Sequence, residues 1–285
     1  MKSQKENIRI HVLHTGQVCV SPGLPFKDTK KNPHLLQLTA ITPYGRKRIW
    51  LPVSAYLIEH PRGLLLFDTG WGREISPRGV YDRIAQIRHM GLVHFLLNQG
   101  ILPPGESVSE QLAERGIRPQ DLDYVILSHL HTDHASGLEC VKQAKKIMVS
   151  EEELGDTKKY AVRYARSMWK NISFTPFAFS DTGSGPVGRS FDLFGDGSIE
   201  LIQMPGHTSG LTAMKVQREG KYVLLFADGG YAEKSWKEMI PPGTALDEDA
   251  AQKSLRWIHD MAKSPDCIEA LANHDPDIIP REIVL

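Results

Sequence analysis

A run of metal-binding side chains directly after a predicted buried strand constrains this chain more than any other feature. Residues 124–128 form a continuous apolar run, which is typical of a buried strand. The next residues read His129-Leu130-His131-Thr132-Asp133-His134. A packed core avoids adjacent ionisable groups, so a purely structural role does not account for this cluster. The pattern therefore predicts a metal site where the strand ends.

The spacing within this cluster predicts how its side chains divide between positions. In extended chain, residues i and i+2 point to the same side, so His129 and His131 can share one ion. A turn into a helix at Asp133 would direct Asp133 and His134 toward a second position, and a helix start favours a carboxylate. Imidazole and carboxylate ligands suit zinc, and also manganese, iron or cobalt.

Three more candidate ligands occur where other predicted strands stop. His207 follows the strand predicted over 199–204, Asp228 follows the strand predicted over 221–227, and His274 follows the apolar run 268–272. Sites built on a sheet commonly use residues at the ends of strands. Together with the cluster, these residues give seven candidate ligands.

The rest of the chain reads as alternating strands and helices of the α/β class. Further strands are predicted over 8–20, 52–59, 63–68, 147–149 and 211–217, and helices over 106–115, from about Ala135, over 151–170 and over 247–263. Residues 171–198 read as irregular. Because no linker is evident, we predict a single domain over 1–285, with a lid-like segment near 77–105 and an insertion near 155–198.

Composition limits the partners of this chain. Its 34 Lys and Arg residues balance 34 Asp and Glu residues, which argues against a nucleic-acid or anionic-membrane binder. No apolar run is long enough to span a bilayer, and no signal peptide is readable at the start. Three scattered cysteines favour a reducing compartment. We therefore expect a cytoplasmic protein with a small-molecule substrate, no nucleic-acid or membrane partner, and a homodimer as an open alternative.

The ligand pattern resembles the metallo-β-lactamase superfamily, whose mark is His-x-His-x-Asp-His followed by single His, Asp and His ligands. The similarity runs from about Pro52 to Asp275 and is greatest to the N-acyl homoserine lactonase family, over 101–103, 121–131, 228–231 and 273–275. One difference is that these lactonases commonly carry Gly-His-[Ser/Thr]-Pro-Gly-His, where residues 206–211 read Gly-His-Thr-Ser-Gly-Leu. The resemblance implies a four-layer αββα sandwich of two mixed β-sheets flanked by helices.

The resemblance also implies two divalent metal ions, with zinc as the first expectation and manganese, iron or cobalt as alternatives. The implied ligands are His129, His131 and His207 for the first ion, Asp133, His134 and His274 for the second, and Asp228 for both. Asp68 stands where the superfamily has an aspartate that orients a ligand imidazole, although a simple turn residue is an equal alternative.

The implied activity is that of a metal-dependent hydrolase that opens a lactone ring, above all that of N-acyl homoserine lactones. A hydroxide bridging the two ions would attack the ring carbonyl. Tyr231 would hydrogen-bond to the developing oxyanion, and Asp133 would carry a proton to the leaving alkoxide. Residues that could line an acyl-chain pocket or simply form core are 84–97, Trp169, Phe174, Phe177 and Phe179.

Other activities stay open at this point. Glyoxalase II-like thiolester hydrolases share the ligands, but their basic C-terminal patch is not recognisable over 245–285. Phosphodiesterases and RNA-processing nucleases of the superfamily share all seven ligands, although neutral charge disfavours a large nucleic acid. True β-lactamases lack the bridging aspartate. A non-enzymatic sensor would bind metal and hydrolyse no ester, lactone or phosphodiester.

Overall fold

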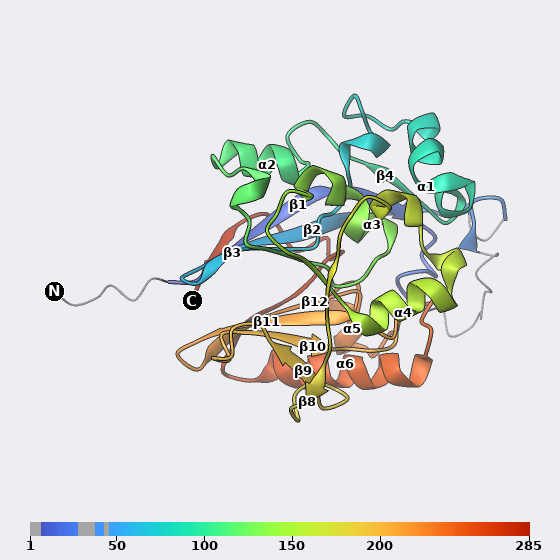
Figure 1. The fold of residues 1–285 in the computed structure, drawn as a ribbon. Helices are drawn as coiled ribbons and strands as arrows, with labels where there is room; N and C mark the ends of the chain where they lie inside the picture. Colours follow the sequence, from blue (N-terminus) through green and yellow to red (C-terminus); the bar gives the residue numbers. More distant parts are fainter. Residues whose placement is uncertain (1–6, 28–37, 43–45) are drawn as a thin grey trace.

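Two β-sheets packed face to face, with helices on their outer sides, organise the chain in the computed structural model (Figure 1). The structure describes residues 7–27, 38–42 and 46–285, so residues 1–6, where no signal peptide was readable, lie outside it. The expected four-layer αββα sandwich of two mixed sheets is confirmed. Among the described residues, no helix has both the length and the apolar character needed to cross a membrane.

The first sheet has eight strands in the order β14-β1-β2-β3-β5-β6-β7, with β4 paired to β1. Its strands are β1 (Arg9–Val20), β2 (Ile49–His60), β3 (Gly63–Phe67), β4 (Asn98–Ile101), β5 (Tyr124–Ile126), β6 (Ile147–Ser150), β7 (Thr175–Phe177) and β14 (Glu282–Val284). Strands β3 and β5 are parallel, with Phe67 opposite Ile126. The residues that follow these two strands therefore emerge side by side at one edge.

The second sheet has six strands in the order β13-β12-β11-β10-β9-β8. They are β8 (Ser180–Asp181), β9 (Arg189–Asp192), β10 (Ile199–Gln203), β11 (Thr212–Arg218), β12 (Lys221–Ala227) and β13 (Cys267–Ala272). Strands β12 and β13 are parallel, with Ala227 opposite Ala272. Asp228 and Asn273, the next residues of each strand, therefore leave the sheet at the same end.

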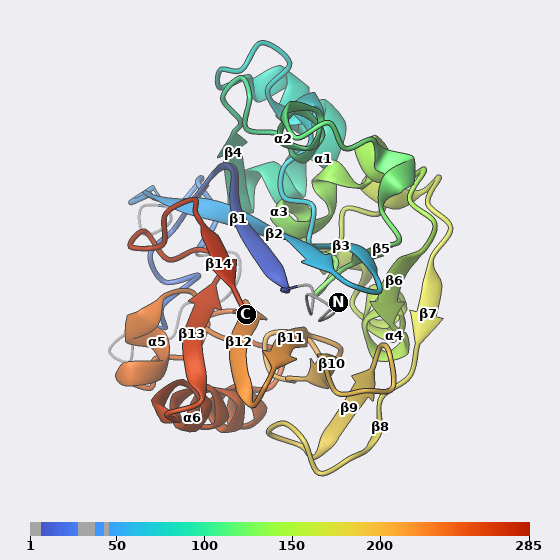
Figure 2. The same ribbon diagram turned by 90° about the vertical axis from the view of Figure 1, so that its left-hand side faces the viewer.

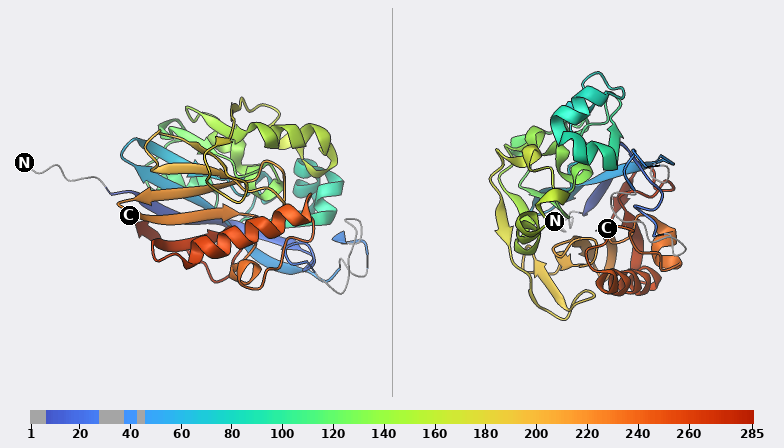
Figure 3. Two further views of the ribbon diagram at one scale, coloured as in Figure 1. Left: turned by 90° about the horizontal axis from the view of Figure 1, so that it is seen from below. Right: turned by 90° about the vertical axis from the view of Figure 1, so that its right-hand side faces the viewer.

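Helices cover the outer faces of both sheets (Figures 2 and 3). Their bounds are α1 (Arg83–Leu97), α2 (Val108–Glu114), α3 (Thr132–Ala135), α4 (Glu151–Lys159), α5 (Glu233–Lys237) and α6 (Glu248–Lys263). Helix α2, predicted over 106–115, begins at Val108, where Ser107 and Glu110 form a reciprocal capping box. The Asp247 side chain accepts from Ala250 N and so caps the start of α6 with a single hydrogen bond.

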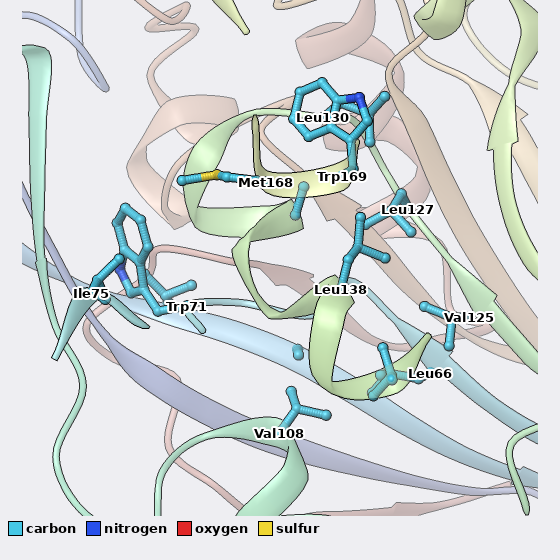
Figure 4. Close-up of a cluster of buried hydrophobic side chains, with 14 of the residues drawn as sticks. Leu66, Trp71, Ile75, Val108, Val125, Leu127, Leu130, Leu138, Met168 and Trp169 are labelled. Carbon is cyan, nitrogen blue, oxygen red and sulfur yellow. The ribbon is translucent and has the colours of Figure 1, made fainter. Parts of the chain in front are cut away.

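Buried apolar side chains form one cluster between each pair of layers. The first, between the outer helices and the first sheet, gathers Leu66, Val125 and Leu138 (Figure 4). The second fills the space between the two sheets, and the third lies between the second sheet and α6. Burying each such side chain contributes about 1.5–3 kcal/mol, so these clusters hold the four layers together.

Several predicted elements differ from the observed ones. The helix expected over 151–170 ends at Lys159, and the chain continues as 3₁₀ turns at Ala161–Arg163 and Arg166–Trp169. Residues 171–198, expected to be irregular, contain β7 at the edge of one sheet and β8 and β9 at the edge of the other. The buried residues Tyr164 and Trp169 pack into the first cluster. Such tertiary contacts override local helical preference.

Candidate metal centre

The seven predicted ligands converge at the ends of strands from both sheets. The cluster 129–134 follows β5 of the first sheet, while β10, β12 and β13 of the second sheet lead into His207, Asp228 and His274. Helix α3 begins at Thr132 rather than near Ala135, which puts Asp133 in its first turn. The ligand atoms form three overlapping groups in which all atoms lie within 4.8 Å of one another.

The first set of donors surrounds His131. Its Nδ1 lies 3.1 Å from Nε2 of His129 and 2.8 Å from Nε2 of His207. Oδ2 of Asp228 completes the set, at 3.4 Å from Nε2 of His207 and 3.8 Å from Nε2 of His129. Three imidazole nitrogens and one carboxylate oxygen thus face a common centre, which is the donor number of a tetrahedral site.

The second set of donors surrounds His274. Its Nε2 lies 3.3 Å from Nε2 of His134 and 3.5 Å from Oδ2 of Asp133. The other oxygen of Asp228, Oδ1, lies 3.2 Å from both Nε2 atoms. The two oxygens of Asp228 therefore face different donor sets. The structure brings together all seven residues in the division that the resemblance implied.

The hydrogen bonds of the outer ring nitrogens show that the second set fits a cation. Nδ1 of His274 lies 2.8 Å from the Pro52 carbonyl, which can only accept, so this nitrogen carries the hydrogen. Nδ1 of His134 lies 2.8 Å from Oδ2 of Asp68, a carboxylate oxygen that accepts, so this nitrogen carries a hydrogen as well. In the neutral form of each ring, Nε2 therefore presents a lone pair toward the buried Oδ1 of Asp228, which accepts no hydrogen bond from the described residues. A divalent ion satisfies this arrangement.

Burial keeps the first set neutral. Burial and the neighbouring imidazoles lower the pKa of His129 and His131 well below the ordinary value. Burial also lowers the pKa of His207 to about 3, although Asp228 opposes this shift. Neutral imidazole is the form that binds metal, so these residues need no proton release near neutral pH.

The second set favours positive charge. Burial alone would lower the pKa of His134, but Asp228 and Asp68 outweigh it and raise this pKa well above the ordinary value. The pKa of His274 is raised against burial in the same way, by Asp228 and Asp133. Burial would raise the pKa of Asp228, yet the two imidazoles hold it well below the ordinary value. The carboxylates here stabilise a cation, whether a proton or a metal ion.

Asp68 is a buried hub rather than a simple turn residue. It accepts from Ser128 N and Ser128 Oγ at 2.8 Å each, and from Nδ2 of Asn273 at 2.9 Å. Because the Ser128 hydroxyl donates to Asp68, it accepts from Nδ1 of His129 at 3.0 Å. Asp68 has φ of 60°, a left-handed conformation that costs of order 1–3 kcal/mol in a non-glycine residue. Asp68 thus orients two candidate ligand rings, that of His134 directly and that of His129 through Ser128, while its own backbone is strained.

Helix α4 anchors both loops that carry the first donor set. Oε1 of Glu153 accepts from Leu130 N at 2.9 Å, between His129 and His131. Oδ2 of Asp156, one helical turn later, accepts from Ser209 N at 2.6 Å, just after His207. The Ser150 hydroxyl, which caps α4, also donates to Gly210 O at 2.8 Å. One short helix therefore sets the distance between these two loops.

A cavity of about 60 Å³ opens onto the donor cluster. Tyr231 lines it and stacks on His274 with ring centroids 5.1 Å apart. Burial raises the pKa of Tyr231 well above the ordinary value, and Asp228 adds to this effect, so its hydroxyl keeps its hydrogen. His94, within the segment near 77–105 that was predicted to be lid-like, also lines the cavity. Among the described residues that line the cavity, His94 and Leu97 are the two that belong to the set predicted to line an acyl-chain pocket.

Arg163, Glu153 and Asp156 were not predicted from the sequence. Each reaches the site through tertiary contacts, and no local motif marks them. Asn273 had a signal, since it directly precedes a candidate ligand at the end of a strand. Phe177 and Phe179 belong to the buried cluster between the two sheets. Of the two roles predicted for them, pocket lining or core, the structure therefore supports core.

Comparison with known proteins agrees with this geometry. A family model described as the metallo-beta-lactamase superfamily matches residues 48–266. The N-acyl homoserine lactonase AttM of Rhizobium radiobacter is 25% identical over 236 residues, covering 80% of this chain and 83% of that protein. A probable metallo-hydrolase of Mycobacterium tuberculosis is 25% identical over 292 residues, covering 98% of this chain and 86% of that protein.

The fold has solved counterparts. The structure of an N-acyl homoserine lactone hydrolase, with the product N-hexanoyl-L-homoserine bound at its catalytic metal centre, superposes with a TM-score of 0.71. It is 20% identical in sequence, and the match covers 94% of each chain. At this level of identity the likeness shows a shared fold.

Proposed function

Because this chain belongs to the metallo-β-lactamase superfamily and is a metal-dependent hydrolase, we propose that it opens lactone rings, with N-acyl homoserine lactones as the first class of substrate. The observation that carries this proposal is the position of Asp228, whose two oxygens face two donor sets. The similarity to the lactonase AttM supports the choice of lactones over other esters. We propose that one domain contains all of this machinery.

We propose that the two donor sets each hold one divalent ion, with zinc preferred because imidazole nitrogen dominates the donors. Such ions supply Lewis acidity, which polarises a carbonyl and lowers the pKa of bound water. The protein's own contribution is to fix the donors before the substrate arrives. Asp68 does this through His134, and the Pro52 carbonyl does it through His274.

Two side chains of the cavity are suited to the proton and charge movements of ester cleavage. We assign Tyr231 to donate its hydroxyl hydrogen to the oxyanion that develops when the carbonyl is attacked, since it is buried and stays protonated. We assign Asp133 to pass a proton to the leaving alkoxide. Asp133 suits this task because it remains 8% exposed and also lines the cavity.

The proposal is tested by proton release from a panel of lactones with metal-loaded protein. The panel contains short- and long-chain N-acyl homoserine lactones and simple γ- and δ-lactones, and Asp228→Ala is the inactive control. We expect release from the lactones, lost in the control together with bound metal. Metal content is measured on both proteins by mass spectrometry, so that loss of activity is tied to loss of the ions.

Other outcomes would redirect the assignment. Activity on thiolesters alone would indicate a glyoxalase II-like hydrolase, and activity on phosphodiesters alone would indicate a phosphodiesterase of the same superfamily. Metal binding with no hydrolysis of any of these bonds would favour a sensor. Each of these results would contradict the lactonase proposal.

A further inference from the structure

Arg163 places a cationic side chain on the wall of the cavity without a carboxylate partner. Among the described residues, no carboxylate oxygen lies within the 4.0 Å that defines an ion pair with this guanidinium. Its Nε is buried and donates to no described residue. Glu153 and Asp156, the acids closest to it in sequence on α4, accept from Leu130 N and Ser209 N. The Arg163 side chain is half-buried, and its buried Nε is a donor that a ligand in the cavity could satisfy.

Among the described residues, Nη2 is the guanidinium nitrogen of Arg163 that has partners. Nη2 donates to Thr244 O at 2.6 Å and approaches His207 O at 3.5 Å. Both acceptors are backbone carbonyls of loops at the cavity, so these bonds hold the side chain in place. The carboxylates of Glu153 and Asp156 act on the charge of Arg163 only at longer range, outside ion-pair distance. Arg163 reaches the cavity because the chain leaves helix α4 at Lys159.

The rest of the cavity lining is mixed. Val18, Val20, Leu24 and Leu97 are apolar, whereas Asn98, Thr132, Asp133 and Thr244 are polar or acidic. Among the described lining residues, Arg163 is the one permanent cation.

We propose that Arg163 is a specificity-determining residue that binds a carboxylate carried by the substrate, so that the preferred substrates are lactones with a carboxylate on or near the ring. This inference rests on the proposed lactonase function and narrows its substrate class, because it places lactones that carry a carboxylate ahead of the neutral N-acyl homoserine lactones. A guanidinium pairs with a carboxylate through two parallel hydrogen bonds, which a neutral substituent cannot provide.

The charge of the proposed site supports an anionic substrate over a neutral one. Three carboxylates, those of Asp133, Asp228 and the buried Asp68, offset three of the four positive charges that two divalent ions would bring. Arg163 adds a further positive charge to the same cavity. An anionic substrate would enter this field favourably, and its carboxylate would remain bound while the ester bond is cleaved.

The test compares two lactones that differ only in one group of the ring. γ-Carboxy-γ-butyrolactone carries a carboxylate where γ-valerolactone carries a methyl group. We expect the wild-type protein to favour the carboxylate by about tenfold or more in kcat/KM, mainly through KM. Arg163→Gln should bring this ratio close to one, and Arg163→Lys should retain part of it. Arg166→Gln, an exposed site on the same segment, is the matched control and should keep the wild-type ratio.

A purely positioning role would give a different result. If Arg163 only holds the His207 and Thr244 loops, Arg163→Gln would slow both lactones by the same factor and leave their ratio unchanged. That result would overturn the proposal, as would a wild-type preference for the methyl lactone or equal rates on both. Metal content of each variant separates these effects from loss of the ions.

A binding measurement keeps the inference separate from the proposed function. The ring-opened products, α-hydroxyglutarate and γ-hydroxyvalerate, are titrated calorimetrically into wild-type protein and Arg163→Gln. Tighter binding of the dicarboxylate, lost in the variant, would support the role of Arg163 even if neither lactone were hydrolysed. Equal binding of both products to the wild type would overturn it, whatever the activity.

Discussion

Nδ1 of His134 lies 2.8 Å from Oδ2 of Asp68, and both side chains are fully buried. This contact directs Nε2 of His134 toward Asp228. Asp68 also accepts from Ser128 and Asn273, so one carboxylate connects the strand ends of both sheets. The orientation of the candidate ligands is therefore built into the protein before any ion binds.

Replacing Asp68 with alanine should weaken metal binding without removing a ligand. The ring of His134 would lose the acceptor that fixes its orientation, and such changes typically cost about 10- to 100-fold in metal affinity. Competition with a chromophoric chelator measures this affinity. Asp260→Ala, at an exposed position of α6, should bind metal like the wild type. Unchanged affinity in Asp68→Ala, with the fold intact by circular dichroism, would show that Asp68 does not support the site.

Replacing Tyr231 with phenylalanine should lower kcat and leave metal content unchanged. The aromatic ring would still stack on His274, while the hydrogen donated to the oxyanion would be lost. Loss of one such donor costs about a hundredfold in kcat. Tyr222→Phe is the control, since the Tyr222 hydroxyl donates to Met261 O on α6. Loss of metal from Tyr231→Phe would contradict the assigned role.

The stability of the metal-free protein should fall with rising pH through the titration of Glu153. Burial raises the pKa of Glu153 from 4.5 to about 7. Between these values the unfolded chain releases a proton that the folded chain keeps, so stability decreases as pH rises and the loss is complete above about pH 7. At 1.36 kcal/mol per pKa unit, the effect is roughly 3 kcal/mol.

Glu153→Gln should remove this contribution, because its amide oxygen can still accept from Leu130 N and does not ionise. Urea unfolding at about pH 4 and about pH 8 measures the difference for both proteins. The variant should be more stable than the wild type at the higher pH and close to it at the lower one. Parallel pH profiles for the two proteins would rule out Glu153 as the source.

A methyl group at residue 210 should disturb the contact between α4 and the loop of His207. A Cβ on Gly210 would lie 2.1 Å from Glu153 N, which is backbone and cannot move aside. We expect Gly210→Ala to cost about 1–3 kcal/mol in unfolding free energy. Gly155→Ala, within α4 and with no neighbour inside 4 Å, should instead add about 0.5–1 kcal/mol. Equal effects of the two substitutions in urea unfolding would contradict this packing argument.

The parts of the fold that the sequence predicted are those with strong local patterns. Continuous apolar runs marked β5, β10 and β12, and the polar residues after them marked the candidate ligands. The helices predicted over 106–115 and 247–263 correspond to α2 and α6, whose starts are capped by the side chains of Ser107 and Asp247. Local patterns also separated His129 and His131 from Asp133 and His134, because helix and strand periodicities differ within 129–134. The assignment of His207, Asp228 and His274 rested on the family resemblance.

The parts that were not predicted depend on contacts between distant residues. Strand β4 has no alternating apolar pattern and exists because it pairs with β1. Strand β14 is only three residues long, Glu282–Val284, and also pairs with β1. Arg163 carries no motif, and its place in the cavity follows from the early end of α4. Periodicity cannot reveal any of these features.

The spread of the donor residues along the chain has a consequence for the order of events during synthesis. His129 and His274 are 145 positions apart, and the second of them follows β13, which completes the second sheet. Contacts this distant require most of the molecule to be assembled first. A nascent chain that has been released only as far as β7 can offer four donors but not the shared carboxylate of Asp228. Capture of both ions therefore belongs to the last stage of maturation, after translation has passed residue 274.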